Sequence, residues 1–277
     1  MKQTLILLIA FLLLVPAFTF AGGSEEVVEE VAVSSFPGLS AVDRSGDFEI
    51  GKKGGRFVVG SFGSDPKSFN YGIAKETSST DVLSQMYSAA FERSQFDFTW
   101  QPDLAESWTM SDDQKVLTVK LKSGLKWSDG TAFTAEDIVW TVEAIHLNPD
   151  SGSRYRSGLL VNGEPADWEV IDDRTFKVTF PDVYADPFSF VSTLYMPKHI
   201  LEPVVKDDIT AFASFWGVDT DVTTVVGNGA FVMSEYIPNQ RVVMKPNPYY
   251  HLKDEKGTQL PYLDEFVYVL VEDQNTE

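Results

Sequence analysis

The longest apolar run of this sequence stands at its amino terminus, where residues 5–15 read LILLIAFLLLV. Lys2 precedes the run, Pro16 interrupts it, and small residues lead up to Ala21, a pattern typical of a secretory signal cleaved after that residue. The alternative is an uncleaved anchor helix, but residues 4–21 are of borderline length for a membrane span and contain a proline. We therefore expect residues 1–21 to be a signal peptide and the remainder to be an exported, soluble protein.

The composition excludes several classes of function. The 277 residues include 41 acidic and 22 basic side chains, for a net charge of −19, which argues against a nucleic-acid partner. Hydrophobic residues make up 43%, enough for a chain of this size to bury a large core. The sequence has no cysteine, which excludes disulfides, thiol catalysis, cysteine-ligated metals and lipid attachment through cysteine.

Residues 22–52 begin with clustered glutamates among small residues, and we expect an acidic flexible tether there, with a short surface helix as the alternative. The body that follows mixes strand and helix patterns. A short buried strand is predicted over residues 56–60, a loop over 63–70, and a helix that begins at Asp81 with Val82 and Met86 on one side.

The middle of the chain gives sharper local signals. Residues 116–121 alternate as in a strand with one buried face, and Asp129-Gly130 marks a tight turn. Thr134 and Asp137 have the spacing of a capping box at the start of a helix. Further elements are predicted as a hairpin over 168–180, a short helix and turn over 185–201, and strands over 230–233, 241–244 and 266–271. This order favours an α/β or α+β fold over an all-β sandwich.

Signals for catalysis are weak. His146, His199 and His251 lack the spacing of a metal motif, so we expect structural or surface roles, with His146 placed near a helix end where a cation suits the helix dipole. The sequence contains no G-x-S-x-G, H-E-x-x-H or Walker A motif. Paired carboxylates would suit a secreted glycoside hydrolase, but so acidic a chain offers pairs everywhere. We expect no catalytic residues, no metal and no cofactor.

Several longer stretches carry a family resemblance. QPDLAESW at 101–108 is followed by LTVKLKSGLKWSDG at 117–130 and FTAED at 133–137. VVGNGAF at 225–231, EY at 235–236, KPNPYY at 245–250 and LPYLD at 260–264 then follow in order. Together they resemble the family-five extracellular solute-binding proteins, which are the oligopeptide, dipeptide and nickel-type receptors of ABC importers.

The resemblance implies a two-lobed periplasmic-binding-protein fold of type II, α/β in class. It implies a first part of lobe I over 53–87, an inserted domain II over 88–200 and a return to lobe I over 201–277. It also implies a non-enzymatic, monomeric receptor that captures peptides or similar small solutes and presents them to an ABC permease in the membrane. The ligand-facing side would be built by Phe69, Asn70, Ser78, Ser79, Thr80, Asn228, Gly229 and Phe231. The alternative for each of them is helix capping or turn formation.

The sequence departs from the family pattern in places. Asn228, Ala230 and Tyr250 replace the usual Thr, Pro and Trp, and Gly23 stands where many relatives carry the lipid-bearing Cys, so release without a lipid anchor is expected. The sequence ends near the entry to the opposing lobe. We therefore expect a fragment, a frameshifted product or an incomplete sequence, with a nonfunctional remnant as one alternative function.

Overall fold

A computed structural model describes residues 50–62, 65–94 and 96–271 of the chain. By compactness the chain divides into Met1–Val33 and Ser34–Glu277, and the described residues all belong to the second unit. The predicted signal peptide and nearly all of the predicted tether thus lie outside the described residues. Within them, no helix is both long and apolar enough to cross a membrane.

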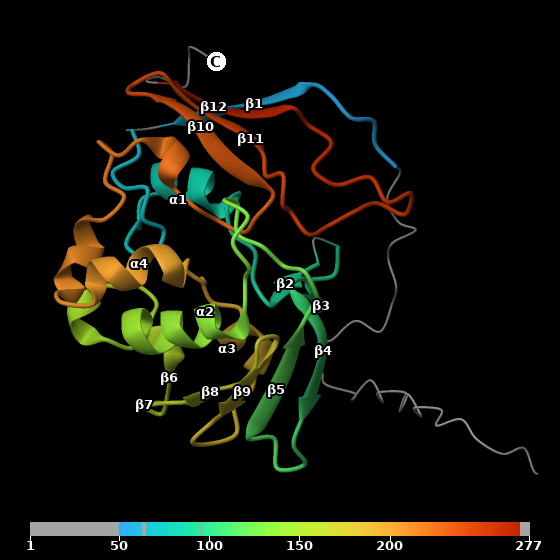
Figure 1. The fold of residues 1–277 in the computed structure, drawn as a ribbon, viewed down its shortest axis with the longest axis vertical. Coiled ribbons are helices and arrows are strands. Elements are labelled where there is room, and N and C mark those ends of the chain that lie inside the picture. The colour runs from blue at the N-terminus through green and yellow to red at the C-terminus, as the bar shows by residue number, and fades with distance from the viewer. Residues whose placement is uncertain (1–49, 63–64, 95, 272–277) are drawn as a thin grey trace, which may run out of the picture. The chain divides into compact units, whose positions relative to one another are not determined.

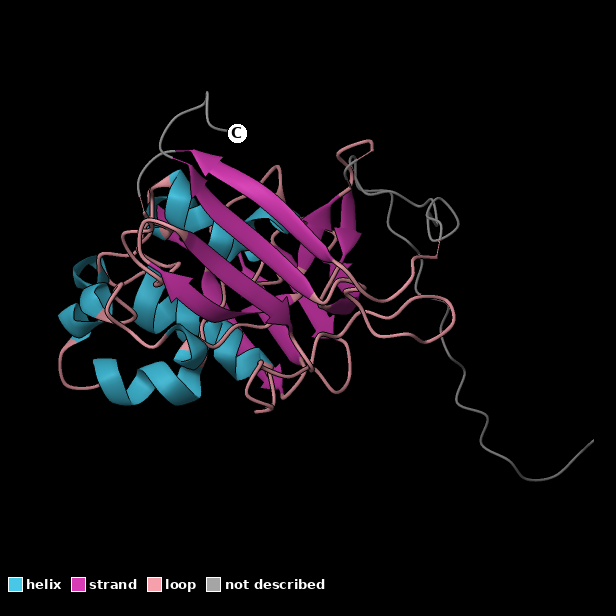
Figure 2. Ribbon diagram, turned by 90° about the horizontal axis from the view of Figure 1, so that it is seen from above, coloured by secondary structure: helices cyan, strands magenta, loops and turns pink. Residues whose placement is uncertain are grey.

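One four-stranded sheet joins the two ends of the described chain in the order β1 (Arg56–Phe62), β12 (Glu265–Val271), β11 (Arg241–Pro246) and β10 (Phe231–Ile237). β1 runs parallel to β12, and the other pairs are antiparallel. Helix α1 (Thr77–Ser84) lies against this sheet, and the Tyr268 hydroxyl donates to the Asp81 carbonyl at 2.9 Å (Figure 1). Figure 2 shows the strands side by side, with the helices gathered toward one side of them.

The two faces of this sheet differ in chemistry, because successive side chains of a strand point to opposite faces. Val242, Met244 and Tyr268 are buried on the face that joins the core. The other face carries the ion pairs Arg56–Glu265 and Arg241–Glu235 around a depression of about 580 Å³. One face therefore supplies the core, and the other presents a hollow with charged and valine side chains.

The prediction of a buried strand over 56–60 is correct for the strand and wrong for its burial. Phe57 and Val58 are 50% and 53% exposed. The reason is topological: β1 is the last strand of the described sheet and pairs with β12 alone. An apolar run of this length does not distinguish a central strand from an edge strand.

A second four-stranded sheet comes from the middle of the chain, in the order β4 (Ala105–Met110), β5 (Val116–Leu121), β9 (Thr175–Thr179) and β8 (Asp167–Asp172), antiparallel throughout. The predicted alternation is confirmed, since Leu117, Val119 and Leu121 are fully buried. The predicted hairpin is β8–β9. Two short ladders complete the strands, β2 (Phe91–Arg93) with β3 (Trp100–Pro102) and β6 (Leu160–Val161) with β7 (Glu164–Pro165).

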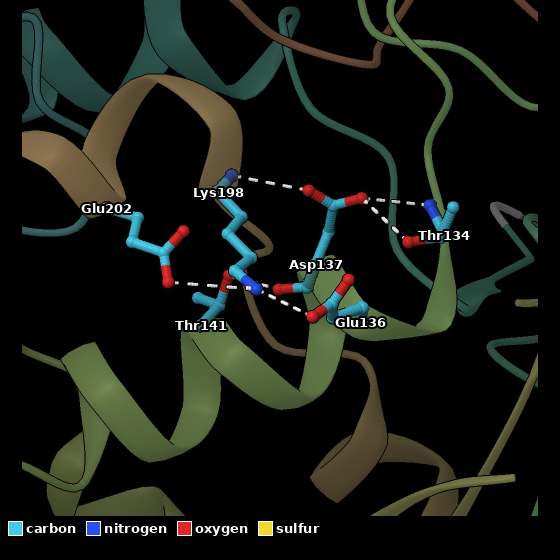
Figure 3. A network of polar contacts seen from close by, with 6 residues as sticks. All are labelled: Thr134, Glu136, Asp137, Thr141, Lys198 and Glu202. Atoms are coloured by element: carbon cyan, nitrogen blue, oxygen red, sulfur yellow. Dashed lines mark hydrogen bonds and ion pairs between the residues drawn. The ribbon is translucent and has the colours of Figure 1, made fainter.

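Helix α2 (Ala135–Trp140) begins at the predicted capping box and continues as the π-helix η2 (Thr141–His146). The Asp137 carboxylate accepts from the Thr134 backbone N–H at 2.9 Å and from the Lys198 backbone N–H at 3.2 Å (Figure 3). Lys198 Nζ lies 2.6 Å from Glu136 and 3.7 Å from Glu202. Burial raises the pKa of Asp137, and these donated hydrogen bonds oppose the rise. The network fastens the start of α2 to the start of α4 (Lys198–Val205).

The remaining helices are short: η3 (Pro149–Ser151), η4 (Arg156–Leu159), α3 (Pro187–Val191), η5 (Ile209–Ser214) and η6 (Val222–Thr224). The helix predicted from Asp81 onward instead begins at Thr77 and ends at Ser84. The Thr80 N–H donates to the Glu76 carbonyl, so the first turn includes the polar residues that we expected to precede the helix. Met86 is buried as predicted, but it lies beyond the helix end.

His146 has a structural role near a helix end, as expected, but its burial disfavours the cation that would suit the helix dipole there. The residue does lie in the last turn of η2, but it is fully buried, and burial lowers its pKa to about 4. Nε2 lies 2.9 Å from the Leu194 carbonyl, which can only accept, so Nε2 carries the proton. Nδ1 then accepts from the Ser153 hydroxyl at 2.8 Å. Desolvation of a charged ring outweighs the attraction of the helix dipole.

Candidate ligand-binding site

The loop before α1 turns two of the predicted site residues into the interior. Phe69 is fully buried, with its ring 5.1 Å from the Tyr236 ring in an edge-on arrangement. The Asn70 side chain, also fully buried, donates to the Phe212 carbonyl at 2.8 Å and accepts from the Gly72 N–H at 3.0 Å. Both groups of the amide are thus bonded within the chain and hold the loop in one conformation.

Two of the three predicted hydroxyl residues of α1 fasten the same loop to the helix, and the third bonds within the helix. Ser79 Oγ accepts from the Lys67 N–H at 2.9 Å, and Ser78 Oγ donates to the Asp65 carbonyl at 3.2 Å. Thr80 Oγ1 donates to the Thr77 carbonyl at 3.4 Å. None of these bonds is an N-cap, because the cap position is Glu76.

The turn before β10 holds the segment that follows α1. The Asn228 side chain accepts from the Ser88 N–H at 2.9 Å and donates to the Ser88 carbonyl at 3.1 Å. The Gly229 N–H donates to the Met86 carbonyl at 2.7 Å, and a Cβ at Gly229 would lie 2.5 Å from the Met86 carbonyl carbon. Phe231 is buried, 5.6 Å from the Phe266 ring.

The predicted site residues therefore form two groups. Phe69, Asn70 and the α1 hydroxyls form one, and the turn residues 228–231 form the other. The amide and hydroxyl groups predicted to meet a ligand already have partners within the chain. Direct contact between these side chains and a solute stays a prediction, while their structural role is evident from the bonds.

A cluster of three tyrosines and one arginine lies where these segments meet, and the sequence analysis missed it. Tyr71 stacks on Tyr87 at 5.6 Å, and the Tyr87 hydroxyl donates to the Val226 carbonyl at 3.1 Å. The Arg154 guanidinium lies 4.8 Å from the Tyr71 ring centre and 4.9 Å from that of Tyr155. All four side chains are half-buried. Their sequence neighbourhood carries no motif, because the cluster unites residues about 80 positions apart.

Two histidines pair with carboxylates distant in sequence. His251 Nε2 lies 2.7 Å from Asp103 Oδ1, with both side chains nearly buried, and His199 Nε2 lies 2.7 Å from Asp129 Oδ2. Burial, followed by the charge of Asp103, raises the pKa of Glu92 beside the first pair. Among the residues that the structure describes, no group of three or more His, Cys, Asp or Glu could hold a metal ion.

Comparison with known proteins decides the family. Residues 99–277, more than half of the chain, match the middle region of the bacterial extracellular solute-binding proteins, family 5. The chain belongs to this family. The resemblance seen in the sequence motifs is thereby confirmed.

Individual relatives agree. A probable ABC transporter-binding protein of Deinococcus radiodurans is 32% identical over 64% of this chain and 31% of its own length. MelB of Agrobacterium fabrum, solved with stachyose, is 28% identical with a TM-score of 0.69. The match covers 80% of this chain and 35% of the MelB chain. AppA of Bacillus subtilis, solved with a nonapeptide, is 27% identical with a TM-score of 0.65 over 81% of this chain and 42% of its own.

These neighbours have the type II periplasmic-binding-protein fold, and the mixed α/β architecture described above corresponds to part of it, as predicted. The chain spans less than half the length of each of these relatives. The relatives named for a function are binding proteins rather than enzymes.

Proposed function

We propose that this protein is the solute-binding component of an ABC importer, which captures peptides or similar small solutes outside the cytoplasmic membrane. The observation that carries the proposal is its membership of the family 5 solute-binding proteins over residues 99–277. In this role it binds its solute and catalyses no reaction. It acts as an unlipidated, exported monomer and delivers its solute to a membrane permease.

The proposal divides the chain into part of lobe I (53–87 and 201–277) and an inserted domain II (88–200). The two main sheets support this division, since the strands of one come from both ends of the described chain and those of the other come from the middle. A solute is gripped between lobes that close by hinge motion and exclude water. Phe69, Asn70, Ser78, Ser79, Thr80, Asn228, Gly229 and Phe231 shape the ligand-facing side. They do so by holding the loop before α1 and the turn before β10 in place.

The test is a binding measurement on the full chain. Tryptophan fluorescence and thermal unfolding would be recorded with a pool of peptides of two to nine residues and, separately, with stachyose as a neutral sugar. Saturable binding with a rise in melting temperature supports the proposal, and the solute that binds identifies the class. Release of sugar from a glycan panel would instead support the alternative of a secreted glycoside hydrolase. A folded product that binds neither solute and turns over no glycan would support the alternative of a nonfunctional remnant.

A further inference from the structure

Arg154 occupies an unusual position for a cation in so acidic a protein. Its guanidinium donates through Nη1 to the Ala74 carbonyl and through Nη2 to the Tyr155 hydroxyl, both at 2.8 Å. The rings of Tyr71 and Tyr155 lie beside it, at 4.8 and 4.9 Å. In the part of the chain that the structure describes, every partner found for this guanidinium is neutral.

Among the other five arginines in the described residues, Arg156 is exposed and bonds to the Leu147 carbonyl, and the remaining four are ion-paired. Arg56, Arg93, Arg174 and Arg241 each form an ion pair with a carboxylate. The protein has 41 acidic residues, so carboxylate partners are abundant. A half-buried arginine whose described partners are all neutral therefore differs from the four ion-paired arginines. A partly desolvated guanidinium gains most from an anion, because charge-assisted hydrogen bonds are about twice as strong as neutral ones.

Hydrogen bonds to neighbouring groups hold the loop that carries Arg154 in one conformation. The buried neutral ring of His146 accepts from Ser153 Oγ, and that oxygen accepts in turn from the Tyr155 N–H at 3.3 Å. Gly152 adopts the left-handed conformation that the turn requires, with φ of 73°. The Arg154 N–H donates to the Gly72 carbonyl at 3.0 Å. The guanidinium is therefore presented in a fixed orientation and needs little reorganisation to bind an anion.

Its location coincides with the segments proposed to face the solute. Tyr71 and Gly72 belong to the loop before α1, and Tyr87 follows α1 and bonds to Val226 at the turn before β10. The arginine thus lies where these two segments meet.

We propose that Arg154, oriented by Tyr71 and Tyr155, is a specificity-determining residue that receives an anionic group, a carboxylate, of the bound solute. A guanidinium has five N–H donors, so the two described bonds leave others for a carboxylate. This inference rests on the proposed function. It deepens that function by naming a chemical feature of the solute, and it disfavours a neutral sugar as the preferred ligand.

The rival explanation is that Arg154 merely fastens the loop at Ala74. Binding measurements that vary both the residue and the carboxyl terminus of the ligand separate loop fastening from recognition of a carboxylate. Peptides of two to nine residues without acidic side chains would be prepared once with free carboxyl termini and once as amides. Their apparent affinities would be measured for the wild-type chain, Arg154→Gln and Arg156→Gln. Arg156 is the matched control, since it lies on the same segment, is exposed, and within the described residues bonds to the Leu147 carbonyl alone.

We expect the wild type and Arg156→Gln to prefer the free acids by about tenfold or more, and Arg154→Gln to lose that preference. Arg154→Lys keeps the charge and should keep part of the preference, which guards against a folding defect in the glutamine variant. Equal affinity of the wild type for acids and amides overturns the inference and leaves the proposed function standing. An unchanged preference in Arg154→Gln assigns the residue to loop fastening alone. Failure of the wild type to bind either pool counts against the proposed function itself, and the inference falls with it.

Discussion

At the scale of single residues, buried polar groups set how the protein responds to pH. His146 is fully buried and its pKa is lowered to about 4, against 6.5 in the unfolded chain. Between these values the unfolded state binds more protons than the folded state, so stability falls as pH drops. The contribution of His146 is fully present above about pH 6.5 and is lost as pH approaches 4.

We expect the free energy of unfolding to fall by roughly 3 kcal/mol between pH 7 and pH 4 because of this one group. Urea denaturation at a series of pH values measures the slope. His146→Gln removes the titration and should flatten that part of the curve. A wild-type slope that survives in His146→Gln contradicts the assignment.

Gly229 packs so closely against the backbone of another segment that a side chain would not fit there. A Cβ there would lie 2.5 Å from both the Met86 carbonyl carbon and the Tyr87 nitrogen, and backbone atoms cannot move aside as a side chain can. We expect Gly229→Ala to destabilise the protein by about 2 to 3 kcal/mol in chemical denaturation. Gly158→Ala is the matched control, because nothing lies within 4 Å of its added Cβ. Equal stability of the two variants would argue against the close packing of the turn on Met86.

At the scale of elements, helix α2 depends on the capping box that the sequence predicted. Thr134→Ala removes the N-cap hydroxyl while it leaves Asp137 in place, and we expect a loss of about 1 kcal/mol in the free energy of unfolding. Thr134→Ser retains the hydroxyl and should recover most of that loss. If Ala and Ser behave alike, the hydroxyl contributes nothing and the carboxylate of Asp137 alone holds the helix start.

The elements also show which structural information is local in the sequence. The capping box and the alternation of Leu117, Val119 and Leu121 are predicted correctly because the residues concerned lie within a few positions of one another. The exposure of Phe57 depends on a partner strand about 209 positions away, and single-sequence patterns do not encode which strand lies outside it. The cluster around Arg154 could not be predicted from the sequence, because its members are also far apart in sequence. Its members come from separate loops, and only the fold brings them together.

For the candidate site, the sequence predicts segments rather than side chains. The family motifs indicate a loop, a helix and a turn, and these segments meet in the structure. They do not tell which side chains on those segments are free to contact a solute. Asn70 and Asn228 look like ligands in sequence, yet their amides are bonded to backbone groups of distant segments, Phe212 and Ser88.

At the scale of the whole molecule, the exposed edge of the first sheet is the surface at which a second chain could add a strand. Within the described residues β1 pairs on one side only, and its outer part carries the exposed Phe57 and Val58. An apolar edge strand offers unpaired backbone groups to a second chain, and lysine is the residue with which natural edge strands prevent such pairing.

We therefore expect the monomer proposed above to persist at low concentration, to self-associate through this edge only at high concentration, and Val58→Lys to weaken that association by about tenfold or more. Sedimentation velocity over a range of concentrations measures the effect. Val183→Lys is the matched control, because Val183 is 52% exposed, nearly the same as Val58, and precedes α3 rather than lying on a sheet edge. If both variants reduce association alike, general surface hydrophobicity drives it. If neither does, the β1 edge is not the contact surface.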